Sequence, residues 1–269
     1  MSEKISEQEY LKRFLGGGYR EVAYENLLPL DKQKLWLSNK KVSDNNSNNK
    51  KVCPVCKNEL MLYLPYGEYM RYNAQCPYCD SLERHRAYWM YWEKLNLFEG
   101  KRIRLLHFAP EKCFLNEIKK MEFIDYYPVD LNAGFYGIRE KVDITDIPYK
   151  DHMFDLIICN HVLEHIPNEV KALSELYRVL KIDGTAFLTV PVCDHAEMTL
   201  EKEEYNTPEL RREFYGNPDH VRMYGKDFTT RLEHAGFIVN RILMNEEYAK
   251  EELDRYGLYK NEAMYECRK

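Results

Sequence analysis

Short apolar stretches alternate with helix-like segments through the second half of the chain. The apolar stretches have the length of buried strands, at 103–109, 123–130, 154–160, 185–192, 237–243 and 263–267, with a shorter one near Val142. Helical spacing of apolar residues occurs from about Lys112, over 168–180 and over 226–234. Strands and helices that alternate in this order predict an α/β fold, in which a parallel sheet carries helices on both faces.

The N-terminal part has a different organisation. Residues 1–37 show helical spacing and predict a helical lead-in, whereas residues 38–51 consist largely of Ser, Asn, Lys and Asp and predict a flexible linker. A small module with a connecting helix follows over 52–98. The α/β domain then occupies 99–269 and contains an insertion at about 193–224.

Four of the eight cysteines form two Cys-Pro-x-Cys pairs, Cys53 with Cys56 and Cys76 with Cys79. Each pair directs two thiolates to one side of a turn, and a hairpin that joins the turns assembles a tetrahedral zinc site, which predicts a zinc ribbon. Four protein ligands leave no open position on the metal, so we expect zinc to stabilise the fold and not to catalyse. Four unrelated buried cysteines are the alternative. We expect Ser81 to cap the helix that follows.

The net charge and the hydropathy of the chain limit the kinds of partner that it could bind. The 269 residues include 39 Lys and Arg against 44 Asp and Glu, a formal charge of −5, so no global basic surface is available to hold long nucleic acid. No apolar stretch is long enough to span a membrane, and the start at Ser2-Glu3-Lys4 lacks the apolar segment of a signal peptide. We therefore expect a cytoplasmic protein without a membrane partner.

Polar residues stand where two predicted strands end. Asp130 ends the strand 123–130, and Asn160 and His161 stand at the end of the strand 154–160. Open α/β sheets bind ligands at the carboxyl ends of their strands. A carboxylate there suits a ribose diol, so the pattern predicts a nucleoside-containing cofactor.

Three further blocks follow one another in a specific order. They are Asp143-Ile144-Thr145-Asp146-Ile147-Pro148, then 154–166 with Asn160-His161-Val162-Leu163-Glu164-His165-Ile166, and Leu176-Tyr177-Arg178-Val179-Leu180-Lys181 followed by Gly184. Over about 101–269 the chain resembles the class I S-adenosylmethionine-dependent methyltransferases, and in particular their small-molecule type 11 branch. The resemblance implies a doubly wound, seven-stranded Rossmann-like sheet with S-adenosylmethionine as cofactor.

The resemblance also implies roles for individual residues. Asp130 would bind the ribose hydroxyls, Asp143 and Ile144 would flank the adenine, and Asn160 with His161 would line the methionine and the acceptor. The full cofactor-binding set expected is Phe108, Ala109, Pro110, Glu111, Asp130, Leu131, Asp143, Ile144, Asn160 and His161.

The loop after the first strand departs from the family pattern. Where the family has a glycine-rich loop, this chain has Leu105-Leu106-His107-Phe108-Ala109-Pro110-Glu111. Ala109 must then allow the close backbone approach that glycine normally allows. Glu111 could face the α-ammonium of the cofactor, whereas its charge would repel the pyrophosphate of NAD.

Methyl transfer to a hydroxyl or an amine also needs a base. The candidates are His161, His165, Asp194, His195 and the adjacent pair Asp219 and His220. We favour Asp219 and His220, with His161, because an aspartate beside a histidine can orient the ring and favour its cation. A purely structural role for each of these residues remains open.

Three functions are compatible with these features. The first is O-methylation of a small polar acceptor, a saccharide or another hydroxylated metabolite; the segment Asp219-His220-Val221-Arg222-x-Tyr224-Gly225 resembles methyltransferases associated with surface polysaccharides. The second is an RNA methyltransferase whose ribbon binds RNA, which the net charge disfavours. The third is a non-catalytic binding protein that no longer holds the cofactor. The sequence leaves the oligomeric state open.

Overall fold

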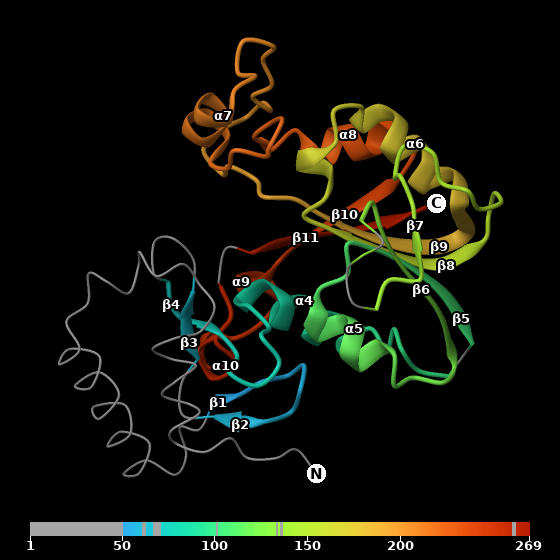
Figure 1. Ribbon diagram of the computed structural model, residues 1–269. Coiled ribbons are helices and arrows are strands. Elements are labelled where there is room, and N and C mark those ends of the chain that lie inside the picture. The colour runs from blue at the N-terminus through green and yellow to red at the C-terminus, as the bar shows by residue number, and fades with distance from the viewer. Residues whose placement is uncertain are drawn as a thin grey trace. The chain divides into compact units, whose positions relative to one another are not determined.

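The computed structural model describes residues 51–60, 63–66, 71–100, 102–132, 134, 137–259 and 262–269. The predicted helical lead-in and all of the predicted linker except Lys51 lie outside these residues. The chain divides into two compact units, whose elements are labelled in Figure 1. One unit contains the described residues up to Glu99 with 112–117 and 243–262, and the other contains 100–111, 118–242 and 263–269. The first unit thus includes two segments that the sequence analysis placed in the α/β domain.

The first unit contains two short antiparallel hairpins and a group of helices. β1 (Lys51–Val52) pairs with β2 (Glu59–Leu60), and β3 (Leu64–Tyr66) pairs with β4 (Arg71–Gln75). The helices are α4 (Glu83–Lys94), α5 (Lys112–Ile118), α9 (Met244–Glu247) and α10 (Lys250–Tyr256). The predicted cap of α4 is wrong: Leu82 is the N-cap, and its backbone N–H donates to Nδ1 of His85 at 3.2 Å.

Aromatic rings fill the interior between α4 and α5. The ring centroids of Trp92 and Phe114 are 4.8 Å apart, and Trp89 stacks on Phe114 with an interplanar angle of 14°. All three side chains are buried. Such offset and tilted aromatic contacts stabilise a core beyond the area that they bury.

Arg86 is fully buried and connects three parts of this unit. Its guanidinium donates hydrogen bonds of 2.8 Å to the backbone oxygens of Ala74, Ser81 and Tyr256. The same group lies over the ring of Tyr63, 3.7 Å from its centroid. One side chain therefore joins β4, the turn after the second cysteine pair and the end of α10.

Replacing Arg86 by alanine is expected to lower the free energy of unfolding of this unit by about 3–5 kcal/mol, because each buried carbonyl left unpaired costs about 1–3 kcal/mol. Urea unfolding followed by tryptophan fluorescence, to which Trp89 and Trp92 contribute, measures the change. Arg71→Ala is the matched control: Arg71 forms an exposed ion pair with Glu83 at 3.1 Å, so its loss is expected to cost less than about 1 kcal/mol. Equal midpoints for the two variants would contradict the role of Arg86.

The second unit is built on a seven-stranded sheet with the order β10-β11-β9-β8-β5-β6-β7. The strands are β5 (Ile103–Phe108), β6 (Ile124–Asp130), β7 (Glu140–Lys141), β8 (Phe154–Asn160), β9 (Leu180–Thr189), β10 (Ile238–Leu243) and β11 (Ala263–Arg268). Neighbours from β9 to β7 pair in parallel, whereas β11 runs antiparallel to β9. The predicted seven-stranded α/β sheet is confirmed, with one reversed strand that the pattern of apolar residues did not indicate.

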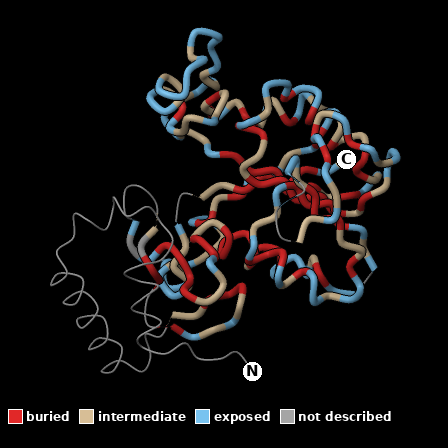
Figure 2. The backbone as a smooth tube through the Cα atoms, in the orientation of Figure 1, coloured by how far each residue is buried: buried red, intermediate tan, exposed pale blue. Residues whose placement is uncertain are grey.

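Two helices of this unit bury their apolar sides with the strands. α6 (Glu169–Val179) and α8 (Phe228–His234) supply the core residues Ala172, Leu173, Leu176, Val179, Phe228 and Leu232. Both helices lie beside the sheet in Figure 1, and Figure 2 shows buried residues along the central strands. The helix expected over 168–180 begins where predicted, since the side chain of Asn168 caps it by accepting from the Lys171 N–H at 3.1 Å.

The insertion at 193–224 contains one helix, α7 (Pro208–Tyr215), which starts at a Thr207 cap and ends at Gly216, whose φ is +77°. The two ends of the insertion are joined by a hydrogen bond, in which the Cys193 N–H donates to the Tyr224 backbone oxygen at 2.8 Å. A single 3-10 turn, η1 (Leu163–His165), follows β8. No described helix combines the length and the apolar character that a membrane crossing requires.

Candidate functional site

β5 and β8 are neighbours in the sheet, and the chain order changes direction at β5, so a ligand site is expected at their carboxyl ends. Ala109, directly after β5, has a φ of +44°, in the left-handed region that favours glycine. Its N–H donates to the Val129 oxygen of the adjacent β6 at 2.8 Å. The turn therefore has the backbone that glycine would adopt, with an alanine in its place.

Replacing Ala109 by glycine is expected to raise the free energy of unfolding of the second unit by up to about 1 kcal/mol, because glycine adopts a positive φ without the clash of a Cβ. Ala109→Val is expected to lower it, since a β-branched side chain tolerates this region least. Urea unfolding followed by circular dichroism measures both changes. A valine variant as stable as the glycine variant would contradict the strained turn.

A chain of hydrogen bonds crosses four strands at this edge. One carboxylate oxygen of Glu111 accepts from Nδ2 of Asn160 at 3.1 Å, and the other lies 3.1 Å from Nε2 of His107. Thr189 Oγ1 donates to Oδ1 of Asn160 at 3.0 Å, and Nδ1 of His107 lies 2.9 Å from the Tyr126 hydroxyl. A carboxylate can only accept, so Nε2 of His107 carries the proton and Nδ1 accepts from the tyrosine.

This network orients Glu111. His107, Asn160 and Thr189 are at most 4% exposed, whereas the side chain of Glu111 is 16% exposed. Glu111 is thus a partly accessible carboxylate in a fixed orientation. Such a group suits a cation such as an α-ammonium and opposes a pyrophosphate.

The end of β6 carries a second acidic group. Oδ1 of Asp130 accepts from the Asn132 N–H at 2.7 Å, which fixes the carboxylate at the strand end. The apolar side chain of Leu131 beside it is 60% exposed. A carboxylate next to an exposed apolar side chain fits a ribose joined to an aromatic base.

Asp143 and Ile144 have different environments. Oδ1 of Asp143 accepts the N–H and the hydroxyl of Thr145, each at 2.8 Å, and the backbone bond holds the pKa of this exposed carboxyl below its usual value. Ile144 is only 3% exposed and belongs to the hydrophobic core, as does Phe108.

Three histidines gather around one buried carboxylate after β8. Nδ1 of His161 lies 3.4 Å from Oε1 of Glu164, which is 1% exposed. His165 follows on the same turn, and His220 of the insertion meets it with ring centroids 4.8 Å apart. The structure therefore brings together residues that stand far apart in the sequence.

The predicted pair Asp219 and His220 is arranged differently from the expectation. The side chain of Asp219 is exposed, and its backbone oxygen lies 3.2 Å from Nδ1 of His165. Burial lowers the pKa of His220, although Glu164 acts in the opposite direction. The expectation that the neighbouring aspartate favours a His220 cation is therefore wrong, and Glu164 is the carboxylate of this cluster.

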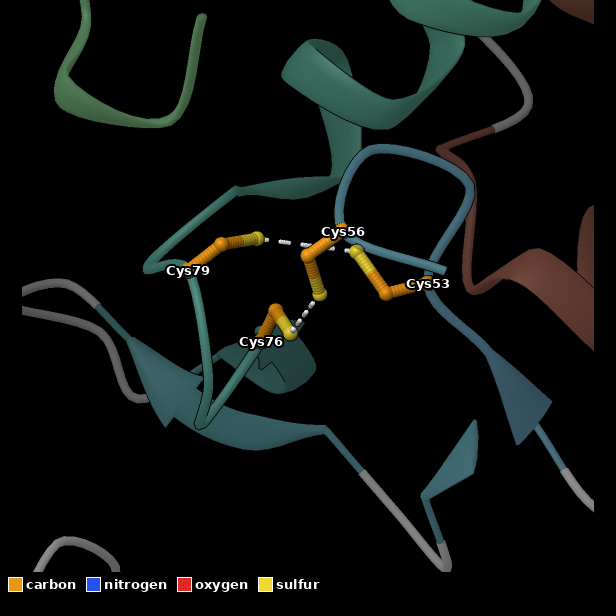
Figure 3. Close-up of side chains that lie close together, drawn as sticks. All are labelled: Cys53, Cys56, Cys76 and Cys79. Carbon is orange, nitrogen blue, oxygen red and sulfur yellow. Dashed lines mark hydrogen bonds between the residues drawn. The ribbon is translucent and has the colours of Figure 1, made fainter. Parts of the chain in front are cut away.

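The two cysteine pairs of the first unit adopt the same turn, as Figure 3 shows. The residues after the second cysteine of each pair, Lys57 and Asp80, have φ values of 60° and 63°. Their N–H groups donate to the oxygens of Cys53 and Cys76 at 2.8 and 3.0 Å. The repeated turn points both pairs of sulfurs toward one point.

The four sulfurs fit a tetrahedral metal ion. Cys53 Sγ lies 3.6 Å from Cys79 Sγ, and Cys56 Sγ lies 3.8 Å from Cys76 Sγ. Bonds of 2.3 Å from zinc to sulfur place neighbouring sulfurs about 3.8 Å apart. Without a bound cation, the pKa of the Cys79 thiol is raised by its hydrogen bonds with the other sulfurs, and the bond with Cys53 contributes most. A bound divalent cation would lower this pKa, because it favours the thiolates.

The sequence analysis missed several residues at these sites. Ser81 was assigned to a helix cap, but its Oγ lies 3.3 Å from Cys53 Sγ and 3.2 Å from Cys79 Sγ. Glu164 and Thr189 were not predicted as site residues. The sequence around an acidic or hydroxyl residue does not show which distant side chains it contacts. Of the remaining candidate bases, Asp194 lies 3.8 Å from Arg241, and His195 is exposed outside the histidine cluster.

Parts of the chain are similar to a known family and to a known protein. Residues 117–188 match the family described as "Methyltransferase domain". An uncharacterised protein of Methanocaldococcus jannaschii is 46% identical over 82 residues, which are 29% of this chain and 36% of that relative. The chain thus covers about a third of the length of this relative.

Two solved structures are similar in fold. A SAM-dependent methyltransferase from Archaeoglobus fulgidus has a TM-score of 0.45 at 18% identity over 69% of this chain and 94% of its own. Phosphoethanolamine N-methyltransferase 2 of Haemonchus contortus has a TM-score of 0.45 at 12% identity over 67% of this chain and 52% of its own. The family match runs from the end of α5 to β9, so Ala109, Glu111 and the insertion lie outside it.

Proposed function

We propose that this chain, whose residues 117–188 match a methyltransferase domain, transfers a methyl group from S-adenosylmethionine to a hydroxyl of a small polar acceptor, a saccharide or a related hydroxylated metabolite. The observation that carries the proposal is the network that fixes the Glu111 carboxylate at the carboxyl ends of β5 and β8. It stands at the position where an α/β sheet binds its ligand.

The cofactor would be held by groups of matching chemistry. Asp130 would accept the ribose hydroxyls, Leu131 would cover one face of the adenine, and Asp143 would bind at the purine edge. Glu111, oriented by His107 and Asn160, would accept from the α-ammonium of the methionine part. Ile144 and Phe108 support these groups from the core.

Bound S-adenosylmethionine supplies an electrophilic methyl group on a sulfonium ion. His161 is the proposed base: its Nδ1 faces Glu164, and its buried Nε2 has no hydrogen-bond partner among the described residues. Nε2 of His161 would take the proton of the acceptor hydroxyl as the methyl group passes to the acceptor oxygen and the electron pair of the broken bond stays on sulfur. Glu164 stabilises the imidazolium that forms, because an adjacent carboxylate favours the charged ring.

A transfer assay with tritium-labelled S-adenosylmethionine and a panel of saccharides tests this function, with total RNA as a separate acceptor. We expect label in the saccharide fraction. His161→Gln should lower kcat by about 10²–10⁴, the usual contribution of a general base. Label in RNA would support the RNA alternative, and cofactor binding without transfer to any acceptor would support the non-catalytic one.

A further inference from the structure

We propose that Glu164, His165 and His220 form a second metal site, which binds a divalent transition-metal cation such as Zn²⁺ independently of the four cysteines. A carboxylate oxygen of Glu164 and one ring nitrogen from each histidine lie within 4.8 Å of one another. Two imidazoles and a carboxylate are the ligand set that open zinc and iron sites use.

Backbone carbonyls fix the tautomers of the two rings. Nδ1 of His165 faces the Asp219 backbone oxygen at 3.2 Å, and Nδ1 of His220 faces the Tyr215 backbone oxygen at 3.3 Å. A carbonyl oxygen can only accept, so each Nδ1 carries the proton and each Nε2 keeps its lone pair. Metal-binding histidines are typically fixed in this way, by an N–H that donates to a backbone carbonyl.

The burial of the Glu164 carboxylate is a second, independent argument for a bound cation. Its side chain is 2% exposed, and Oε2 is buried without a hydrogen-bond partner among the described residues, whereas Oε1 faces His161. An ionised carboxylate buried in this way is costly unless it is paired or bound to a metal. A cation at Oε2 would satisfy this oxygen and leave the contact with His161 intact.

The backbone around the site is fixed before any metal binds. The Val221 N–H donates to the Glu164 oxygen at 2.8 Å, which joins the insertion to η1. Arg222, 1% exposed, donates to the backbone oxygens of Leu163 at 2.8 Å and Ile166 at 2.7 Å. The fold therefore holds the ligands from two distant parts of the chain together. Metal binding then costs little further conformational entropy.

Three protein ligands leave room for an exogenous oxygen on the metal. If the proposed function is correct, this oxygen is the acceptor hydroxyl, because a Lewis acid lowers the pKa of a bound hydroxyl. This consequence rests on the proposed function, whereas metal binding itself does not.

The test is a calorimetric titration of the full-length protein, whose cysteines are already loaded with zinc, with Co²⁺ in the absence of S-adenosylmethionine. We expect one further binding event per chain, weakened by at least about 100-fold in Glu164→Gln and in His165→Gln, since even partners outside the ligand shell contribute about 10–100-fold. His165 is exposed, so its variant should fold even if Glu164→Gln does not. His234→Gln, an exposed histidine at the end of α8, should bind as the wild type does.

Two results would overturn the site. One is a wild type that takes up no Co²⁺ beyond the cysteine-bound metal. The other is a folded His165→Gln protein with unchanged Co²⁺ affinity, which would mean that the buried carboxylate is satisfied by a proton or a water molecule. Neither result bears on cofactor binding, which a titration with S-adenosylhomocysteine measures separately.

Discussion

Replacing Cys76 by serine is expected to abolish tight zinc binding and to unfold the hairpins of the first unit. The free energy of zinc binding to a structural site is folding free energy, on the order of 10–16 kcal/mol for isolated zinc-binding peptides. The strands of the hairpins are only two to five residues long, so we expect the hairpins to unfold without this free energy. Without the Cys76 sulfur, only the three sulfurs of Cys53, Cys56 and Cys79 remain to bind the ion.

Hydrogen exchange read by mass spectrometry, together with zinc content, measures this effect. Amides of β1, β2 and the two cysteine turns should exchange freely in Cys76→Ser, whereas β8 and β9 stay protected. Cys193→Ser is the matched control, because Cys193 lies in the other unit and outside the sulfur cluster. Wild-type zinc content and protection in Cys76→Ser would show that the cysteines do not hold a structural metal.

Replacing Asp130 by alanine is expected to weaken binding of S-adenosylhomocysteine by about 100- to 10,000-fold. Two charge-assisted hydrogen bonds to the ribose hydroxyls contribute about 1.5–3 kcal/mol each, and every 1.4 kcal/mol is tenfold in affinity. The carboxylate is already fixed by the Asn132 N–H, so it pays little ordering entropy on binding.

Calorimetry of Asp130→Ala, with Asp130→Asn as a second variant, measures this loss. In Asp130→Asn the side-chain oxygen can still accept from the Asn132 N–H. This variant therefore loses the charge at residue 130 but keeps the turn. Asp125→Ala is the control on the same strand; Asp125 contacts Arg104 and Arg139 and not the strand end. Zinc content should stay at the wild-type level in all three, and unchanged affinity in Asp130→Ala would remove Asp130 from the ribose site.

The sequence predicted the features that depend on local pattern. Strand and helix positions follow from apolar spacing, so β6, α6, α8 and β11 lie within two residues of their predicted bounds. The predicted strand 185–192 is shifted instead, because β9 begins at Leu180, passes through the buried Gly184 and ends at Thr189. The cysteine cluster was predictable because one spacing occurs twice.

Features that depend on distant contacts were not predictable. The segment 243–262 belongs with the cysteine unit because Arg86 donates to the Tyr256 oxygen across 170 residues, and no local signal marks that contact. The carboxylate that lies close to His165 and His220 is that of Glu164, more than 50 residues before His220, and no local pattern marks this contact.

The most direct test of the account is a calorimetric titration of the zinc-loaded wild type with S-adenosylmethionine and S-adenosylhomocysteine, with NAD as the comparison ligand. The carboxylates of Glu111 and Asp130 predict binding of both sulfur ligands with a dissociation constant on the order of micromolar, about −8 kcal/mol, and no binding of NAD. Binding of NAD, or of neither sulfur ligand by folded protein, would contradict the proposed cofactor site.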